Sequence, residues 1–111
     1  MSVNDYDPEL EELQRRATGR LLLSESFDAA AFVALREHIC GKAEALRSEY
    51  FISKQMLRCL REAASAIRSR AEYVQGAREN LHVANDFEML LDLLIAGEGC
   101  RDRQSGVPRI I

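Results

Sequence analysis

The feature of this sequence that most limits its fold is a long stretch without proline. The two prolines are Pro8 and Pro108, so the 99 residues between them lack the residue that most strongly interrupts a helix. Apolar residues in this stretch recur every three or four positions, as Phe32, Leu35 and Ile39 illustrate, and this is the helical period. We therefore predict an all-α protein.

Four helices are predicted, over residues 8–17, 26–50, 53–75 and 85–96. Thr18 and Gly19 are expected to end the first. Ser53 is a good N-cap residue for the third. Asn85 begins the fourth, and Gly97 is its expected stop.

The chain length of 111 residues predicts a single helical domain. We divide it into an N-terminal segment (1–25), a helical core (26–96) and a C-terminal arm (97–111). The conformations of residues 18–25 and 101–111 are left open.

The two long helices are expected to form an antiparallel hairpin, because only Phe51 and Ile52 separate them. A turn at that point would bring Leu46 close to Leu57. Each long helix would be about 35 Å long, which is about the width of a compact domain of this size.

A hairpin of this length has more apolar surface than one short terminal helix can cover. The run Phe27–Leu35 is apolar except for Asp28, and a helix that is apolar around most of its circumference is contacted on several sides. We therefore predict a homodimeric helical bundle. In the alternative, residues 21–23 and the C-terminal arm complete the core within one chain. The residues expected to mediate self-association are Leu35, Ile39, Leu46, Leu60 and Ile67.

The charge and the cysteine content limit the kinds of partner and the cellular compartment that we expect for this protein. The net charge of −3 is too small to favour nucleic acid or an anionic membrane as the main partner. No apolar run approaches the ~20 residues of a membrane-spanning helix. The cysteines, Cys40, Cys59 and Cys100, are odd in number and widely spaced, which predicts unpaired thiols in a reducing cytoplasm.

No motif in the sequence predicts catalysis or a cofactor. There is no nucleophile elbow and no glycine-rich phosphate loop, so we do not expect an enzyme. The four residues Glu37, His38, Cys40 and Cys59 were considered as metal ligands. They lack the short paired spacings of zinc sites, so no metal is predicted, and Cys40 and Cys59 are interpreted as small buried apolar residues.

One local motif favours a different function. The segment from His38 to Lys42 is similar to the phosphotransfer helix of two-component relays, in which a lysine and then a glycine follow the histidine. Here Gly41 comes before Lys42, so both are displaced from that order. A histidine phosphotransfer domain is retained as an alternative.

A second alternative is a small DNA-binding regulator. The third helix has a basic stripe at helical spacing, which could follow phosphates. Its members are Lys54, Arg58, Arg61 and Arg68, with Ser65 between them. The segment 53–75 nevertheless carries only a small positive excess, and the acidic first twelve residues could cover the stripe.

Three segments together resemble the quorum-sensing antiactivators of pseudomonads, namely SVNDYDPELEELQRR, SESFDAAAFVALREHICGKAEALRSEYF and ISKQMLRCLREAASAIRSRAEYV. The resemblance spans most of the chain. It implies a protein that binds the ligand-binding domain of a LuxR-type, LasR-like transcription factor and blocks its dimerisation and DNA binding. Exposed apolar helix surface suits such a role. The residues expected to contact the partner are Leu22, Leu23, Phe27, Phe32 and Arg36, although which surface faces the partner and which faces a second copy is left open.

Overall fold

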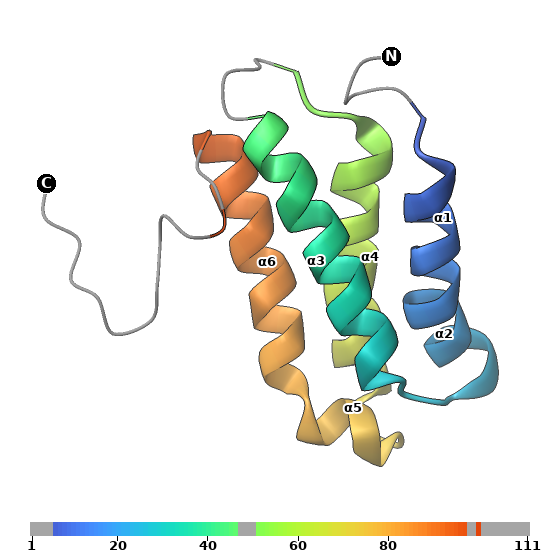
Figure 1. Cartoon of the computed structure of the whole chain (residues 1–111). Coiled ribbons are helices and arrows are strands. Elements are labelled where there is room, and N and C mark those ends of the chain that lie inside the picture. Colours follow the sequence, from blue (N-terminus) through green and yellow to red (C-terminus); the bar gives the residue numbers. More distant parts are fainter. Residues whose placement is uncertain (1–5, 47–50, 98–99, 101–111) are drawn as a thin grey trace, which may run out of the picture.

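The computed structural model describes residues 6–46, 51–97 and 100, and within them all regular secondary structure is helical, without strands (Figure 1). The all-α prediction is therefore confirmed. No helix among these residues is long and apolar enough to cross a membrane.

The N-terminal helix is longer than predicted. It comprises α1 (Pro8–Gln14), a π-helical turn η1 (Arg15–Gly19) and α2 (Arg20–Ser24), which follow one another without a break because Gln14 and Gly19 both keep right-handed helical backbone angles. The predicted stop at Thr18 and Gly19 is wrong. Thr18 is buried, and Leu21 beyond it enters the core. The helix ends at Glu25, whose φ of 52° is left-handed.

Helix α3 (Ala29–Ala45) begins three residues later than predicted. Asp28 caps it, because its carboxylate accepts a hydrogen bond from the amide of Ala31 at 3.1 Å. Leu46 is its C-cap. The predicted end at Tyr50 lies outside the described residues.

Helix α4 (Lys54–Arg70) begins as predicted, with the Ser53 hydroxyl accepting a hydrogen bond from the amide of Met56 at 3.0 Å. It ends before the predicted Gln75. A short turn leads to α5 (Gln75–Glu79), and Arg78 stabilises this turn by donating hydrogen bonds to the carbonyls of Ala71 and Glu72.

Helix α6 (Leu81–Ala96) begins four residues before the predicted Asn85. The chain re-enters a helix directly after α5 at Asn80, whose side chain donates a hydrogen bond to the carbonyl of Gly76. The predicted stop is confirmed, because Gly97 ends α6 with a φ of 71°, a conformation that glycine adopts without strain.

The packing order of the helices differs from the predicted hairpin. Helix α4 packs most extensively against α6, while the N-terminal helix packs against both α3 and α4. Helices α3 and α4 run in opposite directions (Figure 1) but are not one of the closely packed pairs. The hairpin prediction is therefore wrong in its pairing.

The longer N-terminal helix and α6 together cover α3 and α4 within one chain. The structure of a single chain does not show the oligomeric state, so the homodimer stays a prediction. The five residues assigned to self-association are core residues instead, each at most 3% exposed, namely Leu35, Ile39, Leu46, Leu60 and Ile67. The Phe27–Leu35 run is also only partly buried, since Val33 is exposed.

Candidate interaction groove

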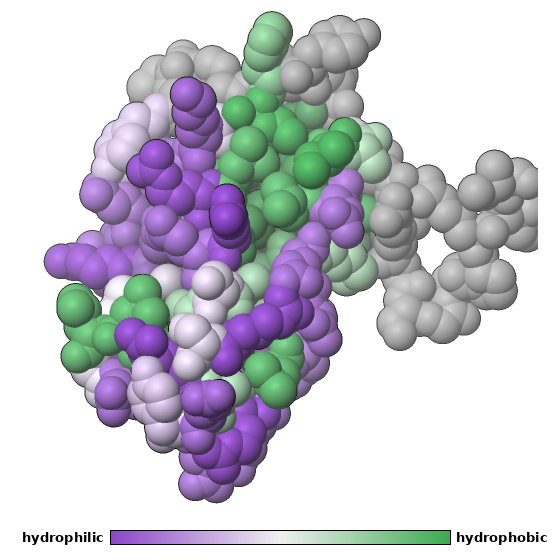
Figure 2. Space-filling view, turned by 180° about the vertical axis from the view of Figure 1, so that it is seen from behind, coloured by the Kyte–Doolittle hydropathy of each residue, from purple (hydrophilic) through white to green (hydrophobic). Residues whose placement is uncertain are grey.

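An open groove runs along the line where α4 packs against α6, on the face of the molecule away from α3. Its volume is about 780 Å³. Figure 2 shows this side, with an apolar area over one part and charged side chains over another. The residues that line the groove are Leu60, Arg61, Ala64, Ser65, Arg68, Ser69, Glu88, Leu91 and Asp92.

The residues at the bottom of the groove are apolar, and some of them are small. Leu60 and Ala64 lie one turn apart on α4, and Leu91 faces them from α6. Ile95 lies one turn beyond Leu91 on the same side of α6 and is 70% exposed. Small side chains at Ala64 and Ser65 leave room for another backbone to approach.

One end of the groove is closed by a salt bridge. The guanidinium of Arg68 pairs with the carboxylate of Glu88 and also donates a hydrogen bond to Asn85 at 2.6 Å. These contacts join α4 to α6. Arg68, the last cation of the predicted basic stripe, is therefore already paired.

The other three cations of the stripe form a basic ridge along α4, consisting of Lys54, Arg58 and Arg61. All three are exposed, and none forms an ion pair with another residue in the described part of the chain. A second, smaller hollow of about 330 Å³ lies on the other side of this ridge, next to Leu22 of α2. The ridge therefore stands between two hollows.

The residues predicted to contact a partner do not form one surface. Leu23 is 87% exposed and Leu22 is partly exposed at the end of the N-terminal helix. Phe32 is 1% exposed, because its ring stacks on Phe27 at 5.0 Å between centroids and meets Phe87 edge-on at 6.0 Å. Phe32 is therefore a core anchor and not a contact residue.

Arg36, the fifth of these residues, is half-buried on α3. Its Nε atom is buried and lacks a hydrogen-bond partner among the described residues. Helix α3 lies on the opposite side of the molecule from the groove, so Arg36 does not contribute to it.

A polar cluster joins the start of α1 to α3. The Asp7 carboxylate lies 2.7 Å from Nε2 of His38 and 2.6 Å from Nζ of Lys42, and it also accepts hydrogen bonds from the amides of Glu9 and Leu10. Burial by itself raises the pKa of Asp7, but the hydrogen bonds from Lys42, His38 and Leu10 outweigh it and hold that pKa well below its ordinary value.

This cluster accounts for the motif that favoured phosphotransfer. His38 is mostly buried, and its Nδ1 lies 3.3 Å from the carboxylate of Glu9. Both ring nitrogens therefore face carboxylates of α1, whereas a phosphotransfer histidine needs one nitrogen open to a partner. The phosphotransfer alternative receives no support from this geometry.

The same cluster is the one place among the described residues where three potential metal ligands converge, since the nearest donor atoms of Asp7, Glu9 and His38 lie within 4.8 Å of one another. Lys42 already neutralises Asp7, however, so the arrangement is that of an ion-pair network. The ligand set weighed from the sequence is not assembled, because Cys59 is buried in the core and burial raises the pKa of its thiol to about 12.

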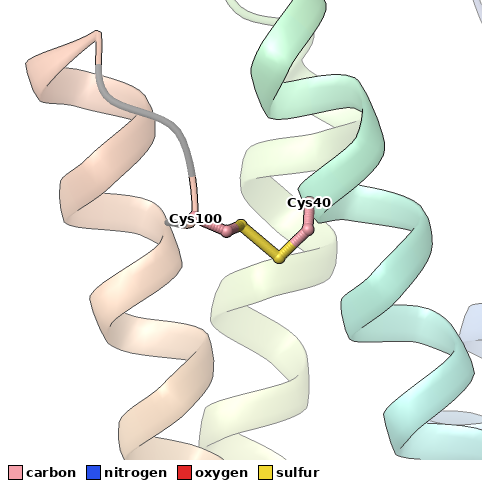
Figure 3. Close-up of a disulfide and its surroundings, with 2 residues drawn as sticks. All are labelled: Cys40 and Cys100. Atoms are coloured by element: carbon pink, nitrogen blue, oxygen red, sulfur yellow. A yellow bond between two sulfur atoms is a disulfide. The ribbon is translucent and has the colours of Figure 1, made fainter. Parts of the chain in front are cut away.

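Cys40 of α3 and Cys100, which follows α6, form a disulfide (Figure 3). Their Cα atoms are 5.7 Å apart. This bond corrects the prediction that all three cysteines are unpaired. The two cysteines are 60 residues apart in the sequence, so their spacing gives no local signal that they form a pair. Cys59 is free and buried, as predicted.

The α6 side of the groove was missed by the sequence analysis. Its residues Glu88, Leu91 and Asp92 recur at helical spacing on the exposed side of the last helix. That spacing was an available signal, but the groove exists only because α6 packs against α4.

Comparisons of this chain with protein-family models, with curated proteins and with solved structures find no match.

Proposed function

We propose that this protein is an inhibitor of protein–protein interaction that binds its partner through the α4–α6 groove. The observation that supports this most directly is the groove itself, in which the half-buried Leu91 lies between charged rims and the exposed Ile95 continues the apolar surface. Grooves of this form between two helices commonly receive an amphipathic helix of another protein.

The specific form of the proposal follows the sequence resemblance. The partner is the ligand-binding domain of a LuxR-type, LasR-like transcription factor, and the inhibitor acts as an antiactivator by preventing the dimerisation that DNA binding requires. The exposed apolar side chains of Ile95 and the half-buried Leu91 would be covered in such a complex, which supplies the favourable burial that association needs.

The test is binding of the receptor domain to matched tryptophan variants. Ser65→Trp fills the groove from an exposed position, whereas Ser24→Trp places the same side chain on α2, outside the groove. We expect Ser65→Trp to weaken binding at least tenfold in calorimetry and Ser24→Trp to leave it unchanged. Equal binding by both variants would exclude the groove, and no binding by the wild-type protein would exclude the receptor.

A small DNA-binding regulator remains the second candidate, because the three cations of the basic ridge form no ion pair with any residue that the structure describes. Acidic side chains flank the ridge on both sides, Glu62 towards the N-terminal helix and Asp92 in the groove. They lower the local positive potential and favour a protein partner over a phosphate backbone.

Two further parts of the proposal are open to direct measurement. Self-association is tested by light scattering after size exclusion, where a monomer mass at all concentrations would remove the dimer from the proposal. A cytoplasmic location, where a LuxR-type receptor acts, is a reducing environment in which disulfides are rare. Mass spectrometry of protein alkylated at lysis reports whether Cys40 and Cys100 are joined in the cell.

A further inference from the structure

We propose that the groove receives a single amphipathic helix whose carboxylates lie along the flank that faces α4. This inference rests on the proposed function and adds the chemistry of the partner segment. It follows from the length of the groove and from the charges on its two walls.

The length of the groove matches a short helix. The lining residues of α4 extend from Leu60 to Ser69, a rise of about 14 Å, or two and a half helical turns. A partner helix of about three turns would cover this length and present apolar residues at positions i, i+3 or i+4, and i+7 to Leu91 and the exposed Ile95, with Ala64 leaving room beneath them.

The charges of the two walls are unequal. On the α4 side, Arg61 lines the groove, and Arg58 and Lys54 continue the ridge one and two turns towards the start of α4. On the α6 side, Glu88 is neutralised by Arg68, which leaves Asp92. Within the groove, Arg61 on the α4 wall and Asp92 on the α6 wall are the charges that form no ion pair with another described residue. The cations Arg58 and Lys54, with Glu62 beside them, continue the α4 side beyond the lining, so cations prevail on that side alone.

The spacing of the ridge is suited to a helix. Lys54, Arg58 and Arg61 are separated by four and three residues, which places them in one row. Acidic residues at the same spacing on a partner helix would lie opposite them. Arginine–carboxylate pairs are often bidentate, so the row would fix the direction and register of the partner as well as attract it.

The experiment is selection from a display library of helical peptides with random surface positions, using the intact protein as bait. We expect the enriched peptides to combine an apolar stripe with acidic residues on one flank. Their affinity should fall at least tenfold for the double variant Arg58→Gln/Arg61→Gln and should also fall with added salt. The matched control is Arg15→Gln/Arg16→Gln on the N-terminal helix, where two exposed arginines pair with Glu12 away from the groove; it should bind normally.

Each outcome decides a different part of the proposal. Helices enriched without an excess of acidic residues, or bound equally by Arg58→Gln/Arg61→Gln, would overturn the charge inference and leave the groove as a binding site. Enriched peptides whose binding is unaffected by Ser65→Trp would overturn the groove as their site, independently of the receptor result. Displacement of the peptides by a DNA duplex, in a salt-dependent and sequence-independent manner, would overturn the inference in favour of nucleic acid.

Discussion

Asp7 is expected to be among the most important polar residues for the stability of this fold. Its carboxylate caps α1 and pairs with His38 and Lys42 of α3, while its backbone exchanges two hydrogen bonds of 2.9 Å with the side chain of Gln55 on α4. One residue therefore joins three helices. Its side chain is 10% exposed, so solvent screens these contacts little.

The expected cost of Asp7→Ala is about 3 kcal/mol. Loss of the cap accounts for about 1 kcal/mol, and loss of a partly buried, charge-assisted hydrogen bond costs about 1.5–3 kcal/mol, with the two bonds not additive. For 111 residues the entropy of unfolding is about 0.23 kcal/mol per kelvin, so the melting temperature should fall by about 13 °C. Asp7→Asn keeps the cap and removes the charge, and should therefore cost less than Asp7→Ala.

Urea unfolding followed by far-UV circular dichroism measures these differences. A double-mutant cycle with Lys42→Met should give a coupling free energy of about 1–2 kcal/mol between Asp7 and Lys42. A loss below about 0.5 kcal/mol for Asp7→Ala would refute the reasoning, because it would mean that the cluster behaves as a screened surface ion pair.

The pH dependence has a definite sign. The folded state lowers the pKa of Asp7 from its ordinary value of 3.8, so the ionised carboxylate contributes stability above that value and loses it as the pH falls below it. The stability difference between the wild type and Asp7→Asn should therefore shrink on acidification below about pH 4. A difference that stays constant into strong acid would show that it does not come from the charge.

Three further outcomes follow from the packing and the cysteines. Reduction of the Cys40–Cys100 disulfide, or Cys100→Ser, should lower the free energy of unfolding by about 4 kcal/mol, the loop-entropy value for a separation of 60 residues; thermal melts with and without reductant measure this, and identical melts would contradict it. Phe32→Ala should cost about 3–5 kcal/mol, whereas Leu23→Ala, at an exposed site, should change stability by less than about 0.5 kcal/mol; the reverse order in urea titrations would invalidate the core assignment. Because burial raises the pKa of Cys59 to about 12, its thiol should resist alkylation at pH about 8 until the protein unfolds, and rapid labelling of the native protein would argue against a buried thiol.

Local signals in the sequence were sufficient for several element boundaries. Ser53 starts α4 and Gly97 ends α6 because a capping hydroxyl and a left-handed glycine act within one turn of the chain. The absence of internal proline similarly predicted an all-helical fold. These features do not depend on which helices become neighbours.

Boundaries that depend on tertiary packing could not be predicted in this way. Gly19 usually favours a helix end, but here the helix continues through it because Leu21 on the far side is buried in the core. The apolar residues of α3 are covered in part by the N-terminal helix, whose length was underestimated because Leu21 beyond Gly19 is buried. At Gly19, burial in the tertiary structure therefore overrides the local preference for a helix end.

The candidate groove illustrates the same limit. Its α4 wall could be recognised as a basic stripe, but its α6 wall required the packing of α4 against α6. The salt bridge between Arg68 and Glu88 joins residues 20 positions apart, and neither spacing nor composition identifies such a pair.

The disulfide divides the chain into a ring and a tail. Residues 40–100 form a covalent ring that contains α4, α5 and α6, while the N-terminal helix and the first part of α3 lie outside it. A protease cut in the turn between Arg70 and Gln75 would open the ring without separating the fragments, which would stay covalently joined until the disulfide is reduced. A cut between Glu25 and Asp28 would instead leave the N-terminal helix attached by non-covalent contacts alone, including those of Asp7. Cleavage at the first site would therefore be visible only after reduction. Cleavage at the second site would allow the whole N-terminal helix to dissociate.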